Sequence, residues 1–469
     1  MNSPDSLQST AGTVALWRTE FSATFALAVP IALTQLGQIA MMTTDLALIG
    51  RLGDAAVGAA ALGHAVLYTG FMLCLGLANA VAPLASQAVG ARNPRTARSA
   101  LHAGLWAVTM MALPLTLLQL HSYETLIALG QTHEMAALAD RYLHGLAWSM
   151  MPACWFIALR NFMSSLDRPQ AGLWITLIAI PANLALAYVL IHGSFGLPRL
   201  DLLGAGTATT IINIGMFLAG VWICFTRQPF RKYHPFSGVL RPDLQLLRKL
   251  LAIGLPISAT FLLEYSLFGI AAVMMGWIST QAMVGHQIAL QVAAIVFMVP
   301  LGIGIAATVR VGHAAGRRDA VGARRAGFAA IVLGVIFMSV MALLVAIFRN
   351  EIPMLFLGAN ADADTVALAA RLLILGATFF IADGVQTIAS GGLRGINDTR
   401  IPLLFSAASF WLVGFVVAYA LAFTLNYGAQ GIWIGLSTGV MTYGVLLIWR
   451  MAILLNRPGL PDVVPAPAA

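Results

Sequence analysis

The sequence predicts an all-α integral membrane protein whose twelve transmembrane helices form two parallel six-helix repeats, an N-lobe and a C-lobe. Three observations support this fold class: an apolar composition, twelve long apolar runs, and landmarks that recur in both halves. Of the 469 residues, 59% are hydrophobic and 9% are charged, whereas soluble domains carry about 45–50% apolar and about 25% charged residues. This composition excludes a soluble enzyme, a nucleic-acid-binding module and a disordered chain.

The length of the apolar runs favours helices over barrel strands. A helix needs about 20 apolar residues to cross a bilayer, whereas a membrane barrel uses strands of about ten residues with alternating polarity. Charged residues, prolines and glycines separate the runs. In chain order we expect spans near residues 21–49, 56–87, 100–120, 138–163, 171–192, 203–225, 250–277, 283–308, 326–348, 365–391, 402–425 and 430–453.

Basic residues are distributed unevenly between the two predicted sides. The termini and the even-numbered connections hold 21 of the 26 Lys and Arg residues, and the odd-numbered connections hold the other 5. Lys and Arg are enriched in cytoplasmic loops, so both termini are predicted to be cytoplasmic. Termini on the same side require an even number of spans, in agreement with twelve.

Five landmarks recur in the two halves at separations between 222 and 231 residues. The pairs are Pro30 with Pro256, His64 with His286, Gly90 with Gly316, Asp167 with Asp398, and Gly204 with Gly431. Because each half has an even number of spans, both halves start on the same side and form parallel repeats, an arrangement typical of transporters.

The repeat divides the chain into five predicted regions. They are a cytoplasmic N-terminal tail (1–20), the N-lobe with spans 1–6 (21–226), a cytoplasmic basic linker (227–243), the C-lobe with spans 7–12 (244–455) and a cytoplasmic C-terminal tail (456–469).

Three acidic residues, Asp45, Glu264 and Asp383, lie well inside apolar runs. Insertion scales put a charged side chain at the centre of a membrane helix at about 2.5–3.5 kcal/mol, and such groups usually face the bundle interior and mark ion or proton pathways. These acids therefore suit a proton, Na⁺ or an organic cation. The alternative is structural neutralisation by a buried arginine, for which the candidates are Arg160, Arg310 and Arg394.

Helical spacing gives two of these acids aromatic and amide neighbours. Glu264 and Phe268 share one helix face, as do Phe379, Asp383 and Gln386. An acid with such neighbours is a candidate site for a cation.

Three further polar residues are candidates. Asn183 follows Pro181 in the fifth span, where an amide beside a proline-freed carbonyl suits either a cation or helix packing. Asp362 and Asp364 precede the tenth span, where they suit either cation attraction at the outer mouth or a helix start.

Enzyme motifs are not supported. Gly435-Leu-Ser437-Thr-Gly439 matches a nucleophile-elbow pattern but lies in a predicted span without a preceding strand. Gly431, Gly435 and Gly439 instead predict a close helix–helix contact. The only lysines, Lys232 and Lys249, do not fit a Walker A motif, and we find no paired nucleophile and base. We expect a secondary transporter, neither an enzyme nor an ATP-driven pump.

Several segments together resemble the multidrug and toxic compound extrusion (MATE) transporters, in particular their bacterial NorM-like branch. They are LAVPIALTQLGQ and TTDLALIGRLG in the first span, the loops VGARNP and AAGRRD, LPISATFLLEYSLF in the seventh span, and FFIADGVQTIASGGLRGINDTRIP in the tenth. The resemblance covers roughly residues 20–455. It implies a V-shaped pair of lobes in the bacterial inner membrane that exports organic, mostly cationic drugs in exchange for H⁺ or Na⁺.

The resemblance also implies roles for individual residues. Glu264 and Asp383 match the C-lobe carboxylates of cation coupling, and they would hold Na⁺ if Na⁺ is the coupling ion. Asp45 matches the N-lobe acid, for both cation and substrate, and Asn183 matches the N-lobe polar cluster. Some relatives carry a carboxylate four residues after this Asn, where this chain has Ala187.

The remaining expectations concern substrate and partners. Gln287 aligns near substrate-contacting positions, and Asp362 and Asp364 complete the candidate substrate site. The expected partners are small-molecule drugs, organic cations and membrane lipid, with no cofactor and no nucleic acid, and the expected state is a monomer. The alternative function is a lipid-linked saccharide flippase of the same superfamily, which would need a cavity rich in Arg or Lys to bind pyrophosphate.

Overall fold

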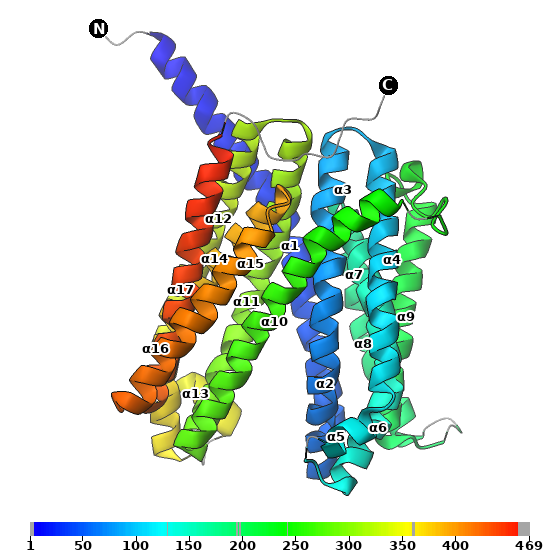
Figure 1. Cartoon of the computed structure of the whole chain (residues 1–469), viewed down its shortest axis with the longest axis vertical. Coiled ribbons are helices and arrows are strands. Elements are labelled where there is room, and N and C mark those ends of the chain that lie inside the picture. Colours follow the sequence, from blue (N-terminus) through cyan, green and yellow to red (C-terminus); the bar gives the residue numbers. More distant parts are fainter. Residues whose placement is uncertain are drawn as a thin grey trace. The chain divides into compact units, whose positions relative to one another are not determined.

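The computed structural model describes residues 4–128, 130–193, 196, 198–241, 243–358 and 362–457, and their regular secondary structure is entirely helical (Figure 1). These residues form two compact units. The N-unit is Leu33–Phe261, and the C-unit takes the residues up to Ala32 and those from Leu262 onward. The unit boundaries fall inside α1 (Pro4–Gly50) and α10 (Leu244–Ile278), so each of these helices contributes to both units.

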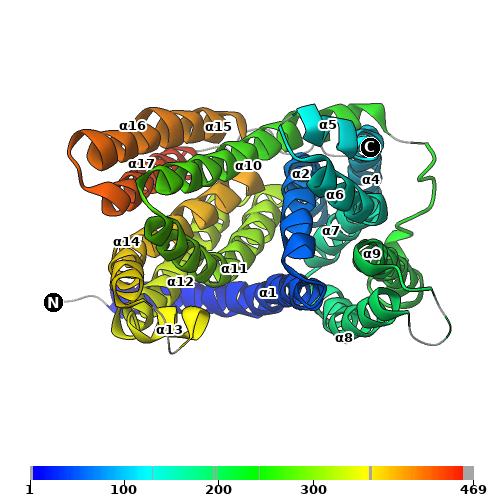
Figure 2. The same ribbon diagram turned by 90° about the horizontal axis from the view of Figure 1, so that it is seen from below.

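The other helices belong to one unit each. Those of the N-unit are α2 (Asp54–Asn79), α3 (Val81–Gly90), α4 (Pro94–Gln119), α5 (Ser122–Ala128), α6 (His133–Leu146), η1 (Ala147–Ser149), α7 (Met150–Ser165), α8 (Gln170–His192), α9 (Asp201–Thr226) and η3 (Phe230–Tyr233). Those of the C-unit are α11 (Thr280–Gly316), α12 (Ala320–Ile347), α13 (Glu351–Leu357), α14 (Ala363–Gly395), α15 (Arg400–Ala407), η4 (Ala408–Phe415), α16 (Val416–Tyr419), η5 (Ala420–Thr424) and α17 (Gly428–Leu455). In the C-unit, α14 lies beside α11, α12 and α17 (Figure 2).

Eleven continuous helical segments among the described residues are long and apolar enough to cross a membrane. The predicted fourth span, 138–163, differs because the 3₁₀ turn η1 separates α6 from α7. Pro152 follows directly after this turn and contributes to it, because it has no N–H for the carbonyl of Trp148 and its ring clashes with that carbonyl. The eleven segments correspond to the other eleven predicted spans, and the fourth span is divided between α6 and α7.

The first and eleventh spans also differ in detail from the sequence prediction. The first helix begins at Pro4 and not near residue 21. The eleventh follows the predicted range closely but contains two π-helical stretches, η4 and η5. Hydropathy reports the length of an apolar run, and it does not distinguish α from π hydrogen bonding.

The two halves repeat the turn that joins their second and third spans. Arg92 and Arg318, 226 residues apart (92 to 318), both adopt left-handed backbone angles, with φ of 56° and 59°. The next residues, Asn93 and Asp319, each accept a backbone N–H three residues later and so cap the following helix. The sequence repeat is thus also a repeat of local geometry.

A second repeated turn corrects one sequence match. Asp167 and Asn397 are the left-handed residues here, with φ of 56° and 63°. In both turns the next N–H donates to the carbonyl five residues earlier. The equivalent of Asp167 is therefore Asn397, at an offset of 230 (167 to 397), and not Asp398 at 231. The sequence match was wrong by one residue because it paired identical side chains, whereas the turn is defined by backbone position.

The predicted glycine contact is present in α17. Gly431, Gly435 and Gly439 all face the helix of the eleventh span. A Cβ added at Gly435 would lie 2.3 Å from the backbone nitrogen of Ala418, closer than real Cβ contacts. The glycines therefore allow two helix backbones to touch, as small residues do in membrane proteins.

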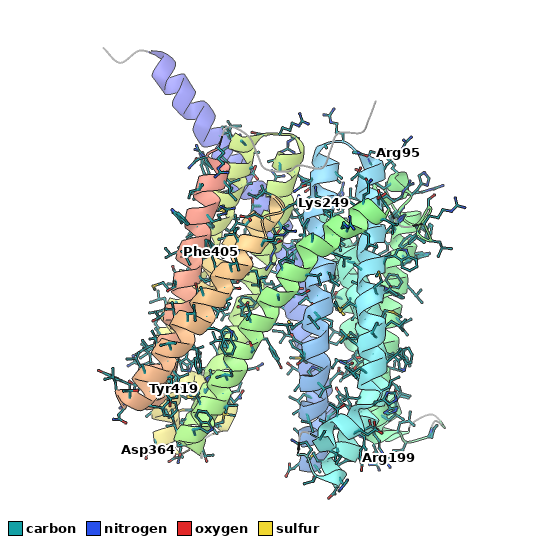
Figure 3. All side chains as sticks on the ribbon, viewed as in Figure 1. Arg95, Arg199, Lys249, Asp364, Phe405 and Tyr419 are labelled. Carbon is teal, nitrogen blue, oxygen red and sulfur yellow. The ribbon has the colours of Figure 1, made fainter. Side chains whose placement is uncertain are left out.

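Within each unit, loops predicted to lie on opposite sides of the membrane are at opposite ends of the helices. In the N-unit, Arg95 and Arg199 mark the two ends (Figure 3). In the C-unit, Asp364 lies at the end where Tyr419 is found, and Phe405 lies toward the other end of the eleventh span (Figure 3). These placements agree with the sequence-based order of spans.

The charge asymmetry makes orientation testable at Ser237, an exposed residue after η3. If the 227–243 connection is cytoplasmic, a membrane-impermeant maleimide should not label Ser237→Cys in intact cells but should label it after permeabilisation. The native cysteines Cys74, Cys154 and Cys224 are buried, so background labelling should be low. Efficient labelling of intact cells would reverse the predicted topology.

Candidate functional site

Two of the predicted interior carboxylates meet at one amide in the C-unit. Gln386 Nε2 donates to Glu264 Oε1 at 3.1 Å and to Asp383 Oδ1 at 3.0 Å. Asp383 and Gln386 are buried on α14, and Glu264 is half-buried on α10. The acidic side of α10 and the acidic side of α14, which were predicted from residue spacing, are therefore in contact. The two bridged oxygens are at most about 6 Å apart, because both bond the same nitrogen.

An aromatic wall lies about one helical turn from these carboxylates. The ring of Phe379 contacts that of Phe268 edge-on, with centroids 6.0 Å apart, and also contacts Trp433 at 5.8 Å. Phe379 and Trp433 are fully buried. Aromatic rings supply apolar surface and a negative face that attracts organic cations.

The three candidate arginines differ in burial and in their contacts. Arg394 is close enough to Glu264 for the two charges to interact. Arg310 instead forms a two-pronged ion pair with Glu20, at 2.8 and 2.9 Å. Arg160 is buried, and its Nη1 has no hydrogen-bond partner in the described part of the chain. The structural alternative thus finds a partner for Glu264 and, among the described residues, none for Asp45.

The C-unit cluster has an excess of one negative charge when fully ionised. Among the described residues it contains two carboxylates, Glu264 and Asp383, and one cation, Arg394, whose charge acts on Glu264. Gln386 donates hydrogen bonds but cancels no charge. Like charges at this distance repel each other in a weakly solvated interior, so one added monovalent cation would make the cluster neutral.

The N-unit contains a second, smaller polar cluster. The Asn183 amide donates to Asp45 Oδ1, and the Thr209 hydroxyl donates to Asp45 Oδ2 at 3.1 Å. Asp45 is half-buried on α1, and Asn183 is fully buried on α8. Sequence reasoning proposed Asp45 and Asn183 and missed Thr209, because a threonine in an apolar span carries no distinguishing signal. Ala187, where some relatives have a carboxylate, is buried.

The other predicted site residues, Gln287, Asp362 and Asp364, form no hydrogen bond with either cluster in the described part of the chain. Gln287 on α11 is exposed. Asp362 caps α14 by accepting the Thr365 hydroxyl at 2.8 Å and its N–H at 3.2 Å, and these bonds lower the pKa of the Asp362 carboxyl. Asp364 lies in the first turn of α14. The helix-start interpretation therefore explains both acids structurally, and their substrate role stays a prediction.

A helical membrane bundle with a duplicated half and interior carboxylates is a membrane transporter rather than an enzyme. The chain belongs to the MatE family, whose model matches residues 30–189 and 256–420, one stretch in each half. The two stretches begin at the prolines that the sequence repeat paired, Pro30 and Pro256. The predicted family is confirmed.

Bacterial relatives match almost the whole chain. A probable multidrug resistance protein NorM of Rhodopseudomonas palustris is 58% identical, with 92% of each chain covered. Another, of Bradyrhizobium diazoefficiens, is 56% identical over 93% of this chain and 94% of the relative. The multidrug resistance protein NorM of Burkholderia vietnamiensis is 37% identical over 90% and 92%.

Solved structures show the same fold at lower identity. The crystal structure of the eukaryotic MATE transporter AtDTX14 matches with a TM-score of 0.84 and 21% identity, over 93% of this chain and 96% of the other. A MOP superfamily transporter from Pyrococcus furiosus matches with a TM-score of 0.81 and 18% identity, over the same shares. The all-α fold built from two repeats is thus confirmed.

Proposed function

We propose that this protein is an antiporter of the bacterial inner membrane that exports small, mostly cationic drugs in exchange for H⁺ or Na⁺ by alternating access. The names of the bacterial relatives support multidrug export. The observation that carries the coupling is the Gln386 bridge between Glu264 and Asp383, with its one surplus negative charge.

In this proposal, charge neutralisation links the ion to the drug. A proton or Na⁺ that enters the cluster removes the surplus charge on Glu264 and Asp383, and this allows α10 and α14 to rearrange and the drug to leave. Each charge that moves inward through 100 mV supplies about 2.3 kcal/mol. That free energy sustains roughly a 50-fold gradient of a neutral drug, since about 1.4 kcal/mol corresponds to tenfold.

The coupling ion is identified by transport in proteoliposomes with a pH gradient and a Na⁺ gradient imposed separately. Drug flux that follows only the pH gradient assigns H⁺, and flux that follows only the Na⁺ gradient assigns Na⁺. No flux with either gradient would contradict antiport. In the Na⁺ case, Glu264 and Asp383 supply oxygen ligands of the kind that hard cations prefer.

The N-unit cluster is proposed to contact substrate or a second cation. Asp45 keeps two neutral donors and no nearby cation among the described residues, so it can attract a positively charged drug. Gln287, Asp362 and Asp364 stay proposed contacts at the periphery.

A lipid-linked saccharide flippase is the second candidate. It is favoured by one observation, the buried Arg160 with an unpaired Nη1 in the described part of the chain. A pyrophosphate headgroup would need more such groups than this one. Transfer of a lipid-linked saccharide between leaflets of protein-containing vesicles, without drug transport, would favour this alternative.

Drug export is expected to reduce dye accumulation in cells. Expression should lower the steady-state content of ethidium-like dyes several-fold, because the interior carboxylates attract cations, and should leave an anionic dye unchanged. The measurement is dye fluorescence in de-energised and re-energised cells that express the protein or an empty vector. Equal accumulation in both strains across a panel of cationic dyes would count against export.

A further inference from the structure

The segment between α9 and α10 is folded against the N-unit in its described part. His102 Nε2 on α4 is 2.7 Å from the carbonyl oxygen of Pro235, and Trp106 Nε1 donates to the carbonyl of Val239 at 2.7 Å. The ring of Tyr233 contacts Phe162 of α7 edge-on at 6.2 Å. The segment that the sequence presents only as a basic linker is therefore held by polar and aromatic contacts.

These contacts shape a cavity of about 480 Å³ at the end of α9. Its apolar lining residues include Cys224, Phe225 and Phe236, and the two phenylalanine rings stack with centroids 5.2 Å apart. Arg231 and His234 also line the cavity. The cavity thus combines an apolar surface with cationic and hydrogen-bonding groups.

The cavity lies where a membrane span meets water. Cys224 and Phe225 are in the last turn of α9, one of the membrane-crossing helices, and Arg231 and His234 follow a few residues later. Trp222 and Phe225 are 62% and 56% exposed, as expected for side chains that face lipid. The cavity is therefore lined both by the end of a membrane-crossing helix and by the basic connection that follows it.

The surrounding charge is strongly positive. Arg227, Arg231, Lys232 and Arg241 are exposed or half-exposed, and no ion pair joins them to an acid in the described residues. The one acid of residues 227–243, Asp243, accepts the backbone N–H groups of Gln245 and Leu246 at the start of α10. The Asp243 carboxylate therefore caps α10 and forms no ion pair with the arginines of the connection in the described residues.

We propose that this cavity binds the phosphate headgroup of an anionic phospholipid. Arg231 and His234 donate hydrogen bonds to the phosphate oxygens, and the lipid backbone and upper acyl chain lie along Phe225 and Phe236. Basic groups beside a membrane span attract anionic lipids. A free phosphate would contact only the polar lining residues Arg231 and His234, and a zwitterionic headgroup would bring its own cation toward Arg231.

The test measures lipid binding to the full-length protein in detergent by native mass spectrometry. Phosphatidylglycerol is titrated, with phosphatidylcholine as the zwitterionic comparison and inorganic phosphate as a competitor. Arg231→Gln is matched by Arg241→Gln, which removes the same charge from the same segment outside the cavity. Phe236→Ala is matched by Leu240→Ala, since Leu240 is 84% exposed.

Phosphatidylglycerol should bind more tightly than phosphatidylcholine, and equimolar phosphate should not displace it. Arg231→Gln should weaken binding roughly fivefold, in line with one basic group at a membrane surface, and Phe236→Ala should weaken it as well. Leu240→Ala should bind as the parent does, and Arg241→Gln should weaken binding clearly less than Arg231→Gln, because Arg241 contributes to the surrounding charge but does not line the cavity. Equal losses in Arg231→Gln and Arg241→Gln, equal binding of the two lipids, or displacement by equimolar phosphate would overturn the proposal.

The result does not depend on transport. Thermal melting of each purified variant shows whether it is folded. A variant that melts at the parent temperature but no longer binds lipid has lost the binding site and not the fold. Because no drug or ion gradient enters the measurement, failure of the proposed antiport would leave the lipid result standing, and the reverse also holds.

Discussion

The double variant Glu264→Gln, Asp383→Asn is expected to lose drug transport driven by an ion gradient while it folds and inserts normally. Both replacements keep the side-chain shape and remove the charge, so the Gln386 amide retains oxygen acceptors on both sides. Without the surplus negative charge, binding of a cation has no electrostatic driving force. The roughly 50-fold drug gradient available at 100 mV should therefore fall to no gradient.

The net charge of the cluster also predicts the behaviour of the two single variants. With either carboxylate removed, the net charge of the remaining carboxylate and Arg394 is zero. Glu264→Gln and Asp383→Asn should therefore each lose coupling nearly as completely as the double variant. If the fold-loss of the double variant instead equals the product of the two single fold-losses, the carboxylates act as two independent sites and not as one shared cluster.

The measurement is ion-driven drug flux into proteoliposomes, with the amount of protein matched between variants. Glu351→Gln is the control, since it removes an exposed acid in the first turn of α13 in the same unit. That control should transport as the parent does. Parental flux in the double variant would assign Glu264 and Asp383 a structural role.

Sequence periodicity predicted which side chains share a face, and it could not predict which faces meet. Three-residue spacing placed Asp383 and Gln386 together on α14, and the structure places Glu264 opposite them. The contribution of Arg394 was left open because it depends on how α10 and α14 cross. Distances between helices separated by more than a hundred residues are set by packing, which a single apolar pattern does not encode.

The misplaced features of the fold have a common physical origin. Hydropathy averages over about 20 residues, so it did not resolve the break before Pro152 or the π-helical stretches of the eleventh span. The repeated turns were found from their side chains, and the one-residue error at Asp167 arose because a left-handed backbone position admits either Asp or Asn. These features are local hydrogen-bonding choices within a correctly predicted membrane bundle.

Gly435→Val is expected to destabilise the C-unit strongly. A Cβ at this position would lie 2.3 Å from the backbone nitrogen and Cα of Ala418. Backbone atoms cannot rotate away as a side chain can, so α17 would have to separate from the helix of the eleventh span. Separation would also open the contacts at Gly431 and Gly439.

The expected loss is about 3 kcal/mol, the upper end of what overpacking costs in well-packed interiors. The control is Gly276→Val on α10, where nothing lies within 4 Å of an added Cβ. Both variants place the same β-branched residue in a helix of the C-unit, so their difference isolates the steric contact from helix propensity. Thermal unfolding of the purified proteins in one detergent should show a markedly lower midpoint for Gly435→Val only. Equal midpoints would mean that α17 tolerates the added side chain by moving, and the close contact would then contribute little to the stability of the C-unit.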